Sequence, residues 1–68
     1  MQYVVVIEKA DNIYAAHVPD LPGCVAAALT KGEVRKLIKE AIELHIDGLK
    51  EQGEPIPEPI TTSELVKV

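Results

Sequence analysis

The sequence contains no tryptophan, no phenylalanine, two tyrosines and a single cysteine among its 68 residues. A single cysteine excludes an internal disulfide framework and any zinc site built from several cysteines. So few aromatic rings leave almost nothing on which nucleic-acid bases could stack. Basic side chains are also scarce, because seven Lys and Arg stand against eleven Asp and Glu and give a formal charge of −4. Phosphate binding needs clustered Lys and Arg, so direct nucleic-acid binding is not expected.

Long apolar runs are missing as well. No run approaches the roughly 20 residues that a helix needs to cross a bilayer. The first residues also lack the positively charged start and apolar centre of a signal peptide. We therefore expect a soluble, cytoplasmic protein without membrane contact.

Apolar residues are nevertheless plentiful for so small a chain, at 47% of the sequence. Residues 1–68 make one small domain, near the lower size limit for independent folding. A core of this size rarely supplies more than roughly 3–5 kcal/mol, and the chain has no disulfides or metal cluster to add to it. Surplus apolar surface of this kind favours association with another chain. We expect a homo-oligomer or an obligate partner.

Three short strands are predicted in the first part of the chain. Residues 2–8 are β-branched and apolar on both faces, which suits a strand covered on two sides. After a polar break, residues 13–18 follow as a second strand, so the two form an antiparallel hairpin. Pro19 and Pro22 cannot donate to a ladder and therefore interrupt pairing. Residues 24–29 are assigned to a third strand.

The clearest element is a helix over residues 31–52. Thr30 and Glu33 have the spacing of a capping box, in which each side chain bonds a free backbone N–H of the other residue. Gly53 suits the left-handed position after a helix, and Pro55 prevents continuation. An apolar stripe recurs at helical spacing, formed by Val34, Leu37, Ile38, Ala41, Ile42, His45 and Leu49.

The chain after this helix must be extended. Alternate prolines in residues 54–59 fix φ and push their predecessors out of the helical region, so this segment is a stiff spacer. Residues 61–68 are then predicted to form a fourth strand, at an edge where it could pair with another chain. The predicted fold is α+β with the order β-β-β-α-β, an antiparallel-rich sheet covered on one face by one helix. The other face of the sheet is left for a partner.

Few residues could carry catalysis. His45 has no Glu-x-x-His or His-x-x-x-His partner on its helix, which favours a buried, hydrogen-bonded structural role. Cys24 could be a nucleophile activated by a histidine, but a small apolar residue entering the sheet is the favoured interpretation. Asp20 precedes a Leu-Pro-Gly turn and is more typical of a residue that accepts backbone N–H bonds than of a catalytic acid. Gly-rich phosphate loops and metal-ligand spacings are absent, so no enzyme activity, metal or cofactor is predicted.

Two motifs in a fixed order resemble a known family. Pro-Asp-Leu-Pro-Gly-Cys at residues 19–24 follows the hairpin, and Gly-Glu-Pro-Ile-Pro-Glu-Pro at residues 53–59 follows the helix. With Thr30, Glu33 and the Glu-Ala-Ile-Glu run at residues 40–43, this series resembles the HicB-like family, the antitoxin half of HicA–HicB toxin–antitoxin modules. The resemblance covers nearly the whole chain and implies a partial RNase H-like fold. It also implies that copies self-associate and that the domain covers a small basic RNA-cleaving toxin, whose charge an acidic chain complements.

Two features associated with the family are not carried over. Many members continue into a helix-turn-helix or ribbon-helix-helix module that binds operator DNA, whereas this sequence ends at Val68, so DNA binding is not expected. Residues 27–29 also read Ala-Ala-Leu where the family usually has a polar residue, a Gly and an Asp. Catalysis on an RNase H-type fold needs clustered carboxylates that hold two metal ions, and no matching set is found.

The leading hypothesis is a non-catalytic antitoxin domain that binds and neutralises a small basic RNA-cleaving toxin of the HicA type. The expected partner-contact residues lie in the loop after the second strand and in the last strand: Asp20, Leu21, Pro22, Gly23, Leu65, Val66 and Val68. The alternative is an orphan homo-oligomeric scaffold without toxin or DNA binding. A more distant rival is a small hydrolase that uses Cys24 or Asp20 with His17.

Overall fold

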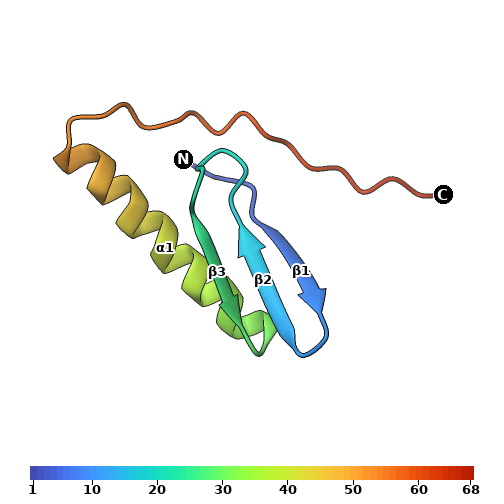
Figure 1. Ribbon diagram of the computed structural model, residues 1–68. Coiled ribbons are helices and arrows are strands. Elements are labelled where there is room, and N and C mark those ends of the chain that lie inside the picture. Colours follow the sequence, from blue (N-terminus) through green and yellow to red (C-terminus); the bar gives the residue numbers. More distant parts are fainter.

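The fold is a three-stranded antiparallel sheet with one helix packed against it (Figure 1). The computed structural model describes residues 1–68. Strand β1 covers Val6–Ala10, β2 covers Ile13–His17, β3 covers Val25–Ala28, and helix α1 covers Lys31–Glu51. The strands lie in the order β1-β2-β3, and both neighbouring pairs are antiparallel. The predicted α+β class is confirmed. No helix has the length and apolar character that crossing a membrane requires.

Strands β1 and β2 are joined by a tight turn at residues 11–12. Asp11 has a φ of 51°, a left-handed conformation that Asp and Asn tolerate better than most residues. This turn aligns Ala10 directly with Ile13. Strand β1 therefore continues to Ala10, beyond the end predicted from the sequence.

The start of β1 at Val6 lies later than the predicted start at residue 2. Its partner β2 ends at His17, and the Val18 N–H is turned toward the β3 side, where it donates to the Cys24 carbonyl at 3.2 Å. The next residue, Pro19, has no N–H to donate. Residues 2–5 thus lie beside a loop, and they are extended without a ladder partner.

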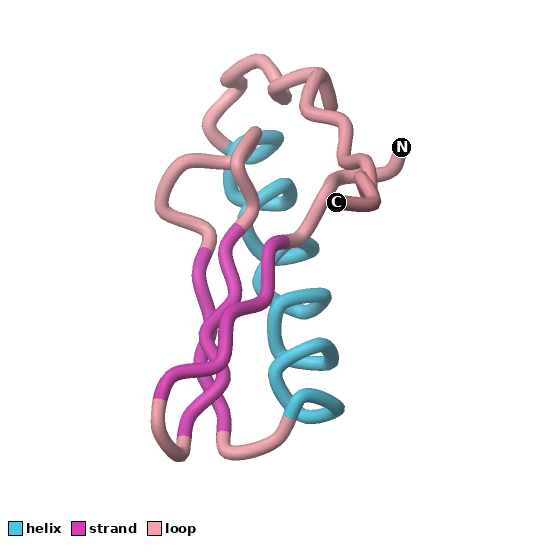
Figure 2. The backbone as a smooth tube through the Cα atoms, turned by 90° about the vertical axis from the view of Figure 1, so that its right-hand side faces the viewer, coloured by secondary structure: helices cyan, strands magenta, loops and turns pink.

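Helix α1 covers one face of the sheet, mainly over β2 and β3 (Figure 2). Alternate strand residues point toward the helix, and Tyr3, Val5 and Ile7 do so along the line of β1. The opposite face has no covering element (Figure 2). Six residues form the buried core: Ala16, Val18, Leu21, Cys24, Val34 and Ile38.

Local hydrogen bonds cap both ends of α1. The Thr30 Oγ1 accepts from the Glu33 backbone N–H at 3.1 Å, whereas the reciprocal bond from the Glu33 side chain is not formed. Half of the predicted capping box is thus present. At the other end the Gly53 N–H donates to the Lys50 carbonyl at 3.1 Å, and the next N–H donates to the Leu49 carbonyl at 2.9 Å. With Gly53 at a φ of 69°, these bonds form a Schellman motif, and the helix ends within one residue of its predicted end.

The apolar stripe of α1 is only partly covered. Val34 and Ile38 are buried, and Ala41 and Ile42 are half-buried. Leu37, which the sequence places in the stripe, is exposed. The sheet has only three short strands, so it covers a smaller part of the helix surface than the apolar stripe predicted from the sequence.

The fourth strand predicted over residues 61–68 is not formed, so this prediction was wrong for the chain by itself. After α1 the backbone crosses the end of the sheet in an extended conformation and runs past β1 without pairing (Figure 1). Strand propensity does not suffice here, because a strand needs the backbone groups of a neighbouring strand. The observed order is β-β-β-α.

Candidate partner-binding surfaces

The loop between β2 and β3 is a compact turn held by its own backbone. The Leu21 N–H donates to the Val18 carbonyl at 3.1 Å, and the Cys24 N–H donates to the Leu21 carbonyl at 3.0 Å. Gly23 has a φ of 83°, a conformation that side-chain-bearing residues rarely adopt. The turn drives the Leu21 side chain inward, where it is fully buried.

Asp20 connects this loop to the segment that follows the helix. Its Oδ2 accepts from the Thr61 backbone N–H at 2.9 Å, and its Oδ1 accepts from the Thr61 hydroxyl at 2.7 Å. A second anchor lies nearby, where the Tyr3 hydroxyl donates to the Pro57 carbonyl at 2.6 Å. The loop motif at residues 19–24 is thus bonded to Thr61, two residues beyond the Pro-rich motif at residues 53–59.

The structure divides the expected contact residues of the loop into two kinds. Leu21 belongs to the core, and the Asp20 carboxylate is half-buried and bonded to Thr61. Pro22 and Gly23 lie at the exposed apex of the loop. Only the apex is free to meet another molecule without a change in the fold.

The expected contact residues of the last segment are all open to solvent. Leu65 and Val68 are fully exposed, and Val66 is mostly exposed. The loop and this segment come together at the contact of Asp20 with Thr61, and residues 62–68 leave the body of the domain from that point (Figure 1).

A third surface is the face of the sheet turned away from α1. Register places Val6, His17 and Val25 in one row across it, followed by Glu8, Ala15 and Ala27 in the next. Val25 is 65% exposed although it is β-branched and apolar. The sequence predicts an open face but not which residues form it. Those residues follow from the strand register, combined with the alternation of side chains between the two faces of each strand.

The residues considered for catalysis are not assembled into a site. No group of three or more His, Cys, Asp and Glu side chains is arranged to hold a metal ion. Cys24 is buried, and burial raises the pKa of its thiol, which disfavours the nucleophilic thiolate. His17 lies exposed on the open face of the sheet. His45 is half-buried on α1 and makes no side-chain hydrogen bond, so its expected hydrogen-bonded role is not realised.

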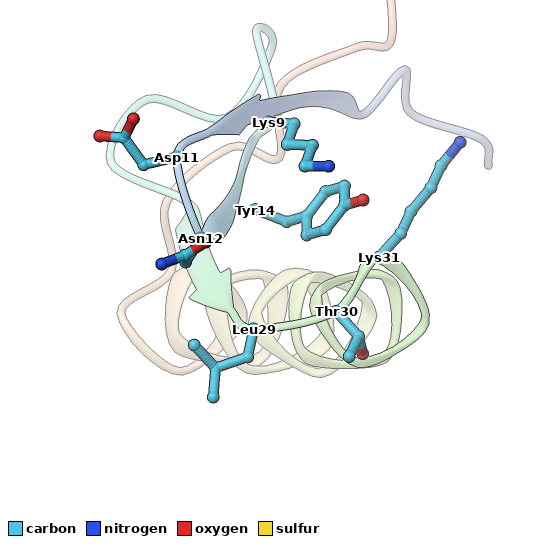
Figure 3. A pocket seen from close by; sticks show the side chains of 7 residues that line it. All are labelled: Lys9, Asp11, Asn12, Tyr14, Leu29, Thr30 and Lys31. Atoms are coloured by element: carbon cyan, nitrogen blue, oxygen red, sulfur yellow. The ribbon is translucent and has the colours of Figure 1, made fainter.

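A hollow of about 520 Å³ lies where β1 turns into β2 and α1 begins (Figure 3). The Tyr14 ring lies across it, and the Lys9 ammonium is 5.7 Å from the centre of that ring. Its lining holds one carboxylate and no histidine or cysteine. Its remaining lining residues are Asp11, Asn12, Leu29, Thr30 and Lys31.

A second hollow of about 470 Å³ follows the groove between β1 and α1. Its apolar floor includes Val5, Ile7 and Ile42, and its rim carries basic side chains from α1. Arg35 and Lys39 stand one helical turn apart on that rim. The groove therefore combines apolar contact with positive charge, in an otherwise acidic chain.

Comparison with known proteins assigns the family. The model of the HicB-like antitoxins of bacterial toxin–antitoxin systems matches residues 3–68, and the chain belongs to this family. The resemblance inferred from the two Pro-rich motifs is thus confirmed. No solved structure gives a significant match.

Several relatives are similar over most of this chain. A UPF0150 protein of Thermoplasma acidophilum is 47% identical over 58 residues, which cover 84% of this chain and 84% of that protein. An uncharacterized 14.9 kDa protein in the rep-hol intergenic region of Haemophilus phage HP1 is 44% identical over 57 residues. That match covers 84% of this chain but 43% of the phage protein, so the chain spans less than half of that relative.

Proposed function

We propose that the chain acts as an antitoxin-type domain that binds and neutralises a small basic RNA-cleaving toxin of the HicA type, without catalytic activity of its own. Membership of the HicB-like antitoxin family supports this function. Charge supports it too, because a domain with a net charge of −4 complements a basic partner and speeds their encounter. The domain acts in the cytoplasm, where the RNA substrates of such a toxin are found.

The observation that carries the proposal is the uncovered face of the sheet. Apolar side chains such as Val25 and Ile13 remain exposed there, on a rigid surface, and exposed apolar patches mark interaction sites. The loop apex formed by Pro22 and Gly23 lies at one end of β3 and can extend this contact surface. Toxin binding at this face would bury the apolar side chains, Val25 and Ile13 among them, that the chain alone leaves in water.

Self-association is a second part of the proposal. Only six residues are buried, while Leu65, Val66 and Val68 are exposed together on one segment. A homo-oligomer that covers this segment would supply the burial that so short a chain lacks. An orphan homo-oligomeric scaffold without a toxin would share this property, so toxin binding has to be tested separately.

Toxin binding is tested by co-expression with the HicA-type toxins encoded in the source genome, with growth and co-purification as the measurements. We expect the wild-type chain to restore growth and to co-purify with its toxin. Val25→Glu, which places a charge on the open face, is expected to abolish both. Leu44→Glu is the matched control, because Leu44 is 74% exposed against 65% for Val25 and lies on the helix instead. Failure of the wild-type chain to bind any of these toxins would leave the scaffold alternative.

A further inference from the structure

We propose that residues 64–68 of one copy form a fourth strand on the β1 edge of a second copy, within the groove between β1 and α1, and that the two copies exchange these segments reciprocally. This inference rests on the self-association proposed above and specifies the interface between the two copies. The groove lies on the helix side of the sheet, opposite the proposed toxin-binding face.

The donor segment has the character of a strand without a neighbour. Leu65, Val66 and Val68 are apolar, exposed and part of an extended backbone that belongs to no sheet. In water such a segment gains nothing from its β-branched residues, because strand stability comes from cross-strand pairing. An available sheet edge would satisfy both its backbone groups and its side chains.

The acceptor is the outer edge of β1. This strand pairs with β2 on one side and with nothing on the other. Because α1 lies mainly over β2 and β3, the helix-facing residues Val5 and Ile7 line an open groove of about 470 Å³. An added strand would fill that groove and place itself beneath the flank of α1.

The two surfaces match in pattern and in charge. In an extended segment Glu64, Val66 and Val68 share one face, while Leu65 and Lys67 share the other. If the first face meets the groove, the two valines cover its apolar floor. The Glu64 carboxylate then lies on the side of the basic rim, which Arg35 and Lys39 provide.

A second copy is the occupant, because the chain directs this segment away from its own edge. The bonds from Thr61 to Asp20 fix where the segment starts, and from there the backbone runs past β1 instead of turning along it (Figure 1). Residues 62–68 extend about 20 Å at roughly 3.3 Å per residue, enough to reach a neighbouring molecule. A two-fold axis would let each copy give and receive one segment.

The first test is the molar mass of the full chain in solution, measured by light scattering at micromolar concentration. We expect a dimer of about twice the 7.4 kDa chain mass. The double variant Leu65→Pro/Val66→Pro is expected to be a folded monomer. Adjacent residues of a strand direct their N–H groups to opposite sides, so one of the two prolines must remove a ladder bond whatever the register.

The matched control is Thr62→Pro/Ser63→Pro, which places the same two prolines before the exchanged segment. Neither residue makes a hydrogen bond through its N–H in the single chain, and we expect this variant to stay dimeric. Circular dichroism should show the same helix content for both variants, because Leu65→Pro/Val66→Pro loses only the exchanged strand. A monomeric wild-type chain would overturn the exchange and the proposed self-association together. A dimer that survives Leu65→Pro/Val66→Pro would overturn the exchange alone.

The second test identifies the groove as the acceptor. Glu64→Lys and Arg35→Glu are each expected to raise the dimer dissociation constant by about two- to thirty-fold, because a reciprocal exchange loses two solvent-exposed ion pairs. Combining the two substitutions should restore part of the lost affinity. Lys36→Glu is the control, because Lys36 lies on α1 outside the groove. Equal effects of Arg35→Glu and Lys36→Glu would overturn the placement of the segment in this groove.

Discussion

Asp20 binds Thr61 through both oxygens of its carboxylate, at 2.9 Å to the backbone N–H and 2.7 Å to the hydroxyl. These residues are 41 positions apart, so the contact ties the loop after β2 to the segment beyond α1. It thereby fixes the chain just beyond the Pro-rich motif against the Pro-Asp-Leu-Pro-Gly loop. The loop supplies the acceptor, and the stiff spacer delivers the donor.

Asp20→Ala should release the segment that follows Thr61. Loss of both bonds is expected to lower the free energy of unfolding by about 1–2 kcal/mol, because Thr61 keeps a half-buried N–H without its partner. Urea denaturation measures the stability, and amide exchange at Thr61 reports the release. Asp47→Ala on the exposed surface of α1 is the control and should change stability by less than about 0.5 kcal/mol. Slow exchange at Thr61 in Asp20→Ala would contradict the anchoring role.

Gly23→Ala should destabilise the domain through the backbone alone. A Cβ at this position meets no atom within 4 Å, but the φ of 83° is unfavourable for any side chain. The expected cost is about 1–2 kcal/mol. Gly32→Ala is the matched control, since its Cβ also meets nothing within 4 Å and its place in α1 favours alanine, by up to about 1 kcal/mol. Thermal unfolding of both variants should therefore shift in opposite directions.

Leu21→Ala tests whether Leu21 packs in the core or serves the partner-contact surface to which the sequence assigned it. Because the side chain is fully buried, its truncation should cost about 2–5 kcal/mol and can unfold so small a domain. Leu44→Ala removes the same atoms from an exposed position and should cost less than about 0.5 kcal/mol. Comparable melting temperatures for these two variants would show that Leu21 does not pack in the core.

The Cys24 thiol should make stability fall at alkaline pH. Burial raises its pKa in the folded chain, so the unfolded chain loses this proton first. The stabilising effect is complete below the pKa of an unfolded thiol, about 8.5, and is lost as pH rises through the higher folded value. Denaturation at several pH values between 7 and 10 measures the slope, and Cys24→Ala should lack this contribution. Fast alkylation of the native protein at pH 8 would argue against a buried, protonated thiol.

Sequence reasoning succeeded where a local signal decides the structure. The cap at Thr30 and the Gly53 with Pro55 behind it set the ends of α1 to within one residue. The β-branched runs and the polar break between them predicted the hairpin. Each of these features depends on residues within a few positions of one another, where backbone sterics and capping bonds dominate.

Prediction from the sequence was less successful for contacts between segments that are distant in the chain. Asp20 was expected to accept backbone N–H bonds, as it does, yet its donor belongs to Thr61 and not to the adjoining turn. Leu21 was expected at a contact surface, but the loop carries it into the core. The fourth strand was expected from composition, and no edge in the same chain receives it.

By itself, the sequence determined the bounds of the helix, the hairpin, the α+β class and the motifs that identify the HicB-like antitoxin family. The tertiary structure decided which side chain Asp20 binds, which loop residue fills the core and which face of the sheet stays open. The physical reason is the range of the interactions. Caps and turns are set by neighbours in the chain, whereas burial and strand pairing depend on which surfaces the folded backbone brings together.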